Sequence, residues 1–135
     1  MTADDAMADF DPADPSTAPT GAYLTALGMT VVEATGDAAA LRWDGPVGAT
    51  SAYTAAVETT CSIGAALWWG AETGGRAVGM SNHTTVFELD ARGPFAARAT
   101  PLDRGQVQQL WRCEITDGDG RACASGEVLM ANLSA

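Results

Sequence analysis

The sequence predicts an α+β domain in which a curved antiparallel β-sheet wraps around one long central helix. Residues 51–72 are apolar on nearly every side and contain no proline, and no glycine before Gly64, so a helix is the regular element that fits this length. The flanking segments have the patterns of strands joined by short turns, and short turns demand antiparallel neighbours. Because the strands are apolar on one face only, the single long helix must cover that face.

The N-terminal residues differ in composition from the rest of the chain. They are rich in aspartate and proline and carry no base, which predicts a flexible acidic arm over residues 1–18 and a single domain over residues 19–135. A secretory signal carries basic residues where this segment carries acids, so we do not expect it to act as an export signal. The acids and prolines are Asp4, Asp5, Asp9, Asp11, Asp14, Pro12, Pro15 and Pro19.

A short helix and a hairpin are expected before the long helix. Residues 20–29 place Tyr23, Leu24 and Leu27 at helical spacing. Residues 29–35 and 38–44 then have strand character, and the turn between them contains Gly36.

The long helix carries one charged residue before its C-terminal turn, Glu58, and we expect Thr50 or Ser51 to cap its N-terminus. The i, i+3, i+4 rule places Thr54, Cys61, Ser62 and Ala65 on the same stripe as Glu58, so a polar seam runs along an apolar helix. A buried carboxylate is costly unless it is hydrogen-bonded or protonated. The seam therefore either faces solvent or lines a site.

Four strands are expected after the helix, over residues 77–87, 94–102, 107–116 and 122–132, with turns near residues 103–105 and 117–120. The first of them is apolar at its ends and polar in the middle. This polar segment either lines a site or belongs to an edge strand or a β-bulge whose face is exposed to solvent. The polar residues are Ser81, Asn82, His83 and Thr84.

Charge and cysteine usage exclude several classes of function. The formal net charge is −10, with seven basic residues, all arginine, against seventeen acids, which argues against nucleic-acid and membrane binding. The spacing of Cys61, Cys113 and Cys123 matches no metal motif, and reduced core cysteines are typical of a cytoplasmic protein. With His83 as the single histidine, no metal site and no cofactor are expected.

The order of these elements resembles the hotdog fold, and specifically the PaaI-like acyl-CoA thioesterases of the 4-hydroxybenzoyl-CoA thioesterase superfamily. The resemblance covers residues 21–133 and is most specific in VETTCSIGAALW (57–68), VGMSNHTTVF (78–87) and TPLDRGQVQQLWRCEITDGDGRACASGEV (100–128). It implies a homodimer or dimer of dimers with an acyl thioester site between subunits. It further implies that Glu58 is the carboxylate that attacks the thioester or activates water, and that Ser62 accompanies it.

Several positions depart from the family pattern. The family carries His-Gly-Gly nine residues before the carboxylate, where this chain has Ala49, Thr50 and Ser51. Two arginines that would suit coenzyme A phosphates are replaced by Gln106 and Val107. A basic residue expected beyond the strand at 77–87 is Glu88, and Arg104 alone remains.

Three functions fit this pattern. The first is hydrolysis of a small acyl thioester, with Glu58 as general base or nucleophile and the start of the helix as the oxyanion site. The second is a non-hydrolytic reaction of specialised biosynthesis, such as a cyclisation, dehydration, isomerisation or decarboxylation, on a small molecule without coenzyme A. The third is a binding protein with an inactive site.

Pocket residues are expected around Glu58. His83 is either a proton donor in the cleft or a surface residue, and Trp68 and Trp69 are expected to pack at the helix end or to form a subunit contact. The expected substrate-binding residues are Thr50, Ser51, Tyr53, Ser62, Asn82 and His83.

Overall fold

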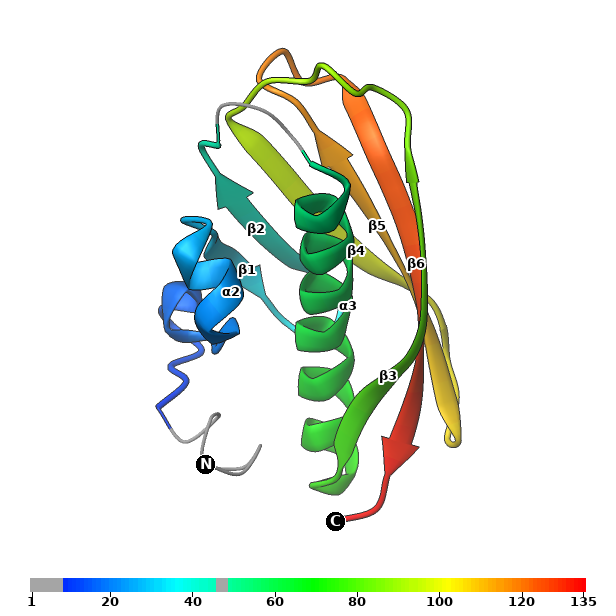
Figure 1. The fold of residues 1–135 in the computed structure, drawn as a ribbon. Coiled ribbons are helices and arrows are strands. Elements are labelled where there is room, and N and C mark those ends of the chain that lie inside the picture. The colour runs from blue at the N-terminus through cyan, green and yellow to red at the C-terminus, as the bar shows by residue number, and fades with distance from the viewer. Residues whose placement is uncertain (1–8, 46–48) are drawn as a thin grey trace.

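The computed structural model describes residues 9–45 and 49–135, and its centre is a six-stranded antiparallel sheet curved around one long helix, α3 (Figure 1). This is the predicted architecture. The strands are ordered β1-β2-β4-β5-β6-β3, so β1 and β3 form the two edges. Their bounds are β1 Thr30–Ala34, β2 Ala39–Trp43, β3 Arg76–Val86, β4 Phe95–Arg104, β5 Gln108–Thr116 and β6 Ala122–Leu133.

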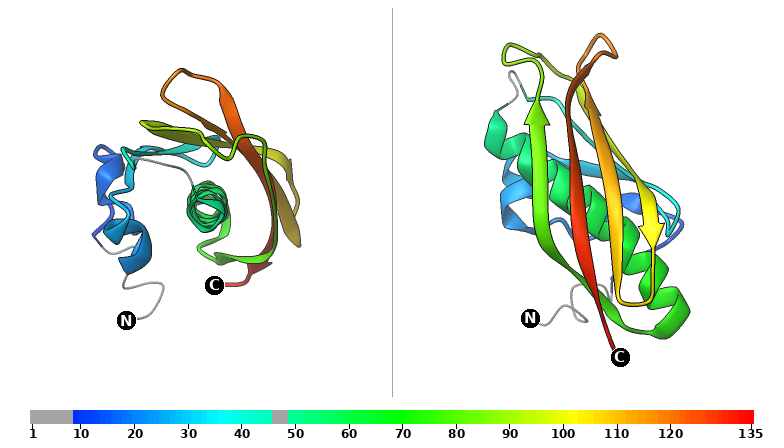
Figure 2. Two further views of the ribbon diagram at one scale, coloured as in Figure 1. Left: turned by 45° about the horizontal axis from the view of Figure 1, so that its top comes forward. Right: turned by 90° about the vertical axis from the view of Figure 1, so that its right-hand side faces the viewer.

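The central helix α3 spans Thr50–Thr73, within one residue of the prediction at each end. Seen end-on, it lies inside the curve of the sheet (Figure 2). Its N-cap is Ala49, in an extended conformation, and not the predicted Thr50 or Ser51, which already belong to the first turn. At the other end Gly74 adopts φ +72°, a left-handed conformation that glycine adopts without the Cβ clash of other residues.

The sheet is apolar on the face that meets the helix, as predicted. Along β5, Trp111, Cys113 and Ile115 are fully buried, while Arg112 and Glu114 are exposed. This alternation follows from the two-residue period of a strand. The helix therefore covers the inner face and leaves the outer face to solvent.

Strand β3 pairs with β6 alone in the described sheet, so its other edge is open. Its pairing with β6 shifts register between Gly79 and Ser81, which marks a β-bulge. The edge-strand and bulge interpretations of the polar segment are therefore both confirmed.

The N-terminal part is more ordered than the sequence indicated. Residues 1–8 of the predicted arm lie outside the described residues. A short 3₁₀ helix, Pro15–Thr17, follows Asp14, whose carboxylate accepts a hydrogen bond from the Ser16 N–H at 3.1 Å. Ala18 is buried, and the 3₁₀ helix contacts β1, so this part of the arm packs on the domain. The short helix α2, Gly21–Ala26, follows.

Within the described residues, no helix is long and apolar enough to span a membrane. All three cysteines are buried and unpaired, as expected of reduced core residues. Trp69 Nε1 donates to the Leu133 carbonyl at 2.8 Å, in agreement with packing at the helix end.

Candidate functional site

The polar seam on α3 places Glu58 on the surface of the single chain. Thr54 and Ser62, one turn to either side, are half-buried, whereas Cys61 and Ala65, which were expected on the same stripe, are fully buried. Of the two interpretations of the seam, exposure to solvent is therefore the one that describes Glu58 within a single chain. The Ser62 hydroxyl makes only a long contact, 3.9 Å, with the Met130 sulfur, so it remains available to other partners.

The Glu58 carboxylate lies against edge strand β3 where the strand carries Gly79. A Cβ placed on Gly79 would stand 3.3 Å from Glu58 Oε1, so the carboxylate packs on bare backbone. Gly79 is not among the site residues predicted from the sequence. A glycine inside a strand is itself a signal of a bulge or a close approach, and this signal could have identified it.

Asn82 ties β3 to the helix turn that carries Glu58. Its Nδ2 donates to the Thr54 backbone carbonyl at 3.0 Å, and its Oδ1 accepts from the Thr84 hydroxyl at 2.7 Å. The Thr54 carbonyl is also the acceptor that helix geometry assigns to the Glu58 N–H. Asn82 thus contacts the helix turn before Glu58, and much of its hydrogen-bonding capacity is used within the fold.

Two predicted pocket residues lie away from Glu58. Tyr53 is 1% exposed and packs edge-on against Phe95 at 5.7 Å between ring centroids, in the core. His83 is exposed and pairs across strands with Glu127 on the outer face of the sheet. The reason is periodicity: His83 adjoins Asn82 and must point to the opposite face, and Tyr53 lies five residues from Glu58 on the helix.

The Tyr53 hydroxyl has no hydrogen-bond partner among the described residues. Burial, followed by the neighbouring Cys123 thiol, raises the pKa of this phenol above its ordinary value. Tyr53 is therefore a neutral core residue.

The N-terminus of α3 presents the other predicted group, Thr50 and Ser51, which are both exposed. Ala49 has no side chain that could cap the first-turn amides, and these amides carry the positive end of the helix dipole. Ser51 Oγ accepts a hydrogen bond from the Tyr23 hydroxyl of α2 at 3.3 Å. Tyr23 was not among the predicted site residues, because its proximity to α3 arises from tertiary packing.

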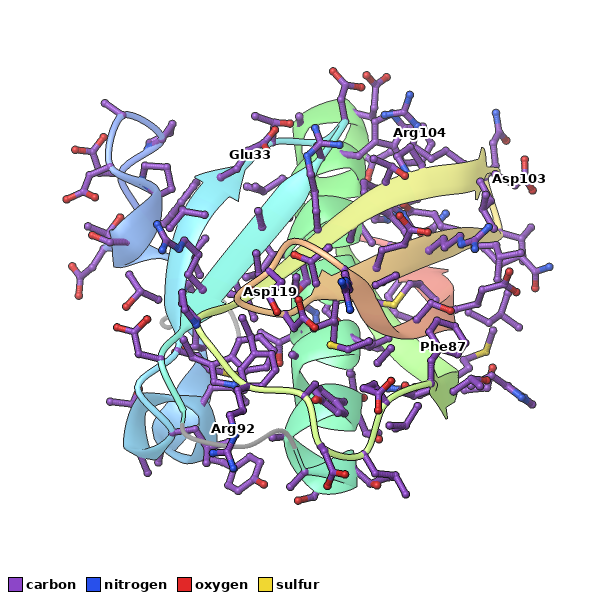
Figure 3. All side chains as sticks on the ribbon, turned by 90° about the horizontal axis from the view of Figure 1, so that it is seen from above. Glu33, Phe87, Arg92, Asp103, Arg104 and Asp119 are labelled. Carbon is purple, nitrogen blue, oxygen red and sulfur yellow. The ribbon has the colours of Figure 1, made fainter. Side chains whose placement is uncertain are left out.

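Two hollows in the described part of the chain lie away from Glu58. One, about 540 Å³, is lined by charged residues of the β3–β4 and β5–β6 loops, among them Arg92 and Asp119 (Figure 3). The other, about 500 Å³, is lined by Trp68, Trp69 and Arg104. Neither contains Glu58.

Arg104, the cation expected to remain for a phosphate, is already engaged. Its Nη1 donates to the Gly36 carbonyl at 2.7 Å and to the Asp37 carboxylate at 2.9 Å, and its guanidinium lies 5.3 Å from the Trp68 ring centroid. A bound phosphate would have to compete with Asp37 for this charge. In the described part of the chain, no group of three or more metal-binding side chains is present.

Comparison with known proteins places this geometry in a family. No family model matches the chain. One relative carries the name "Putative esterase Rv1847" and comes from Mycobacterium tuberculosis. It is 38% identical to this chain over 84 residues, and the match spans 62% of this chain and 60% of that protein. Its solved structure has a TM-score of 0.78 at 33% identity and covers 84% of this chain and 97% of its own. The chain belongs to the same family as Rv1847 and has the hotdog fold.

Two further solved structures are similar in fold to this chain. AziG of S. sahachiroi has a TM-score of 0.78 at 30% identity, covering 86% of this chain and 99% of its own. The thioesterase HI1161 of Haemophilus influenzae has a TM-score of 0.79 at 19% identity, covering 93% and 92%, and shares the fold. The hotdog helix and the sheet around it are thus common to all three relatives.

Proposed function

We propose that the chain is a hotdog-fold enzyme that hydrolyses a small acyl thioester, with Glu58 as general base or nucleophile. The observation that carries this proposal is the position of Glu58. It is exposed in the N-terminal half of a helix that is otherwise buried or half-buried around it, and it lies against the open edge of the sheet at Gly79. An accessible carboxylate on a rigid element suits a base or nucleophile.

The oxyanion site of the proposed reaction is the start of α3, where the amides of Thr50 and Ser51 meet the positive end of the helix dipole. The amides of Thr50 and Ser51 lie eight and seven residues before Glu58 on one helix, or about 12 and about 10 Å along its axis. That is too far for these amides and Glu58 to act on one carbonyl group. A complete site therefore requires Glu58 from one chain and the helix start from another.

The second chain in this proposal pairs along β3. The free edge of β3 offers unpaired backbone groups, and Val78 and Met80 on it are 40% and 52% exposed. An open edge of this kind is a template for strand pairing between chains. Such pairing would cover the exposed face of Glu58. A dimer of dimers would contain the same interface.

A second candidate is a non-hydrolytic hotdog reaction on a substrate without coenzyme A. It is favoured by the engagement of Arg104 with Asp37 and by the net charge of −10, both of which disfavour a polyanionic carrier. Ala49, Thr50 and Ser51 stand in place of His-Gly-Gly, so no imidazole orients the thioester. In this reaction Glu58 would still act as an acid or base. In the third function, an inactive binding protein, Glu58 would have no catalytic role.

The test compares Glu58→Gln with Glu72→Gln, which changes another exposed glutamate of α3 that is remote from the site. Acyl-CoA and acyl-N-acetylcysteamine thioesters are supplied and thiol release is followed with a thiol reagent. We expect Glu58→Gln to lower kcat at least a hundredfold, in line with the loss of general acid–base catalysis of about 10²–10⁴, and Glu72→Gln to retain the wild-type rate. Equal rates for both variants would contradict the role of Glu58. Release of no thiol by the wild type would favour the second candidate.

A further inference from the structure

Gly79 is a glycine that the backbone does not require. Its φ is not positive, unlike those of Gly21, Gly28, Gly74 and Gly120, so an alanine could adopt the same conformation. Glycine weakens a strand because it has no side chain to pack. The reason for a glycine here must therefore be the space around it.

That space is occupied by the Glu58 carboxylate. A Cβ on residue 79 would lie 3.3 Å from Glu58 Oε1 and 3.9 Å from Val128 Cγ1. The first distance is shorter than ordinary van der Waals contact by a few tenths of an ångström, so the carboxylate would have to move. The second is ordinary contact, so the rest of the surroundings would accept a methyl group.

The helix cannot withdraw freely to make room. The Asn82 amide holds the Thr54 carbonyl at 3.0 Å, one turn before Glu58, and Thr84 orients that amide. The backbone of the Glu58 turn is thus fixed to the same strand that carries Gly79. A side chain at residue 79 would displace the carboxylate and leave the helix in place.

We propose that Gly79 is a positioning residue, whose missing side chain sets where the Glu58 carboxylate lies along the edge of β3. This inference rests on the proposed function of Glu58. It extends that function by assigning a role to the bulge: the register shift at Gly79 and Ser81 brings bare backbone, in place of a side chain, to the carboxylate. Larger residues at position 79 would move the carboxylate further.

The kinetic test uses Gly79→Ala and Gly79→Val, with Gly70→Ala as the matched control. Gly70 also lacks a positive φ, and a Cβ there makes only an ordinary contact of 3.6 Å, remote from Glu58. With S-benzoyl-N-acetylcysteamine as the probe, we expect kcat to fall about threefold to tenfold for Gly79→Ala and about a hundredfold for Gly79→Val, with a smaller change in KM. Gly70→Ala should retain the wild-type kcat.

Two readouts separate positioning from a folding defect. The melting temperature of Gly79→Ala should equal or exceed that of the wild type, since alanine suits a strand better than glycine does. In a Glu58→Asp background the shorter side chain no longer meets the added methyl group, so Gly79→Ala should cost nothing further. An equal loss in both backgrounds, or an unchanged kcat in Gly79→Val, would overturn the proposal.

A third readout does not depend on turnover. In protein labelled with ¹³C at the glutamate carboxyl carbons, the Glu58 resonance is identified by its absence in Glu58→Gln. It should shift in Gly79→Ala and stay in place in Gly70→Ala. If Glu58→Gln keeps full activity, the proposed function fails while this measurement still decides whether Gly79 places the carboxylate. An unshifted resonance in Gly79→Ala would overturn the positioning role by itself.

Discussion

Glu58 and Tyr53 show how the fold gives two residues of one helix opposite surroundings. They are five positions apart, about 140° around the helix axis. Glu58 is exposed beside the sheet edge, whereas Tyr53 is 1% exposed among Phe95 and Trp43. The Tyr53 hydroxyl is buried without a hydrogen-bond partner in the described chain, an arrangement that costs stability.

Replacing Tyr53 by phenylalanine should therefore not destabilise the protein at neutral pH. We expect Tyr53→Phe to leave the free energy of unfolding at pH 7 unchanged or to raise it by about 1 kcal/mol, because the orphan hydroxyl is removed and the ring packing is kept. Thioester turnover should be unchanged. Urea denaturation and the thiol-release assay measure the two quantities. A fall in stability would contradict the unpaired hydroxyl, and a fall in turnover would contradict a purely structural role.

Tyr53→Phe should also change how the free energy of unfolding falls at alkaline pH. Burial raises the pKa of Tyr53 in the fold, whereas the unfolded chain releases this proton near pH 10. The contribution of protonated Tyr53 to the free energy of unfolding is therefore fully present below that pH, and it is lost as the pH rises above it. Buried thiols, including Cys113 with a pKa raised to about 12 by burial, add to the loss in both proteins. Tyr53→Phe should lose less stability than wild type between pH 9 and 10.5, and an equal loss would contradict the prediction.

The sequence predicted residue positions only as far as local periodicity reaches. Helical spacing placed Thr54, Glu58 and Ser62 on one stripe. Asn82 and His83 were both predicted around Glu58, although strand alternation makes adjacent residues point to opposite faces. Which of the two meets the helix depends on the pairing of β3 with β6. The proximity of Tyr23 to Ser51 depends on how α2 packs.

At the level of elements, α3 lies very close to β5. A Cβ on Gly64 would stand 2.5 Å from Trp111 Cζ3 and 2.6 Å from Cη2, so the helix can approach the indole only at a glycine. Trp111 is fully buried and its Nε1 donates to Gln109 at 2.8 Å, which holds the ring in place. Gly64 thus sets the distance between helix and sheet.

Gly64→Ala should destabilise the protein although alanine favours helices. The gain in helix propensity is about 1 kcal/mol, but overpacking against a fixed ring costs about 1–3 kcal/mol, so we expect a net loss near 2 kcal/mol or less. Gly70→Ala, where the added Cβ makes only an ordinary contact of 3.6 Å on the same helix, should be neutral or stabilising. Thermal or urea unfolding measures the difference. A second substitution, Trp111→Phe, should recover part of the Gly64→Ala loss, and a stabilised Gly64→Ala would contradict the close contact.

Element identities were well predicted, because hydrophobic periodicity is a local signal. The ends of α3 and the four later strands were found within two residues of the prediction. The N-cap was wrong because Ala49 offers no side-chain signal. The position of β3 at a sheet edge depends on strand order, and the sequence left the edge as one of several alternatives.

At the scale of the whole molecule, the proposed site is larger than one chain. Glu58 and the amides at the start of α3 are about 10–12 Å apart along the helix, and β3 leaves one sheet edge open. Pairing two chains along that edge would form two equivalent sites related by twofold symmetry. The central claim is that each site takes its carboxylate from one subunit and its oxyanion donors from the other.

Subunit complementation tests this claim most directly. Thr50→Pro removes one amide donor at the first helical position, where proline is tolerated, and Glu58→Gln removes the carboxylate. Each variant alone should be inactive. After subunit exchange in an equal mixture, half of the dimers would be mixed, each with one intact site, so turnover should return to about a quarter of the wild-type rate. A mixture as inactive as its parents, or an active Thr50→Pro variant, would contradict the shared site.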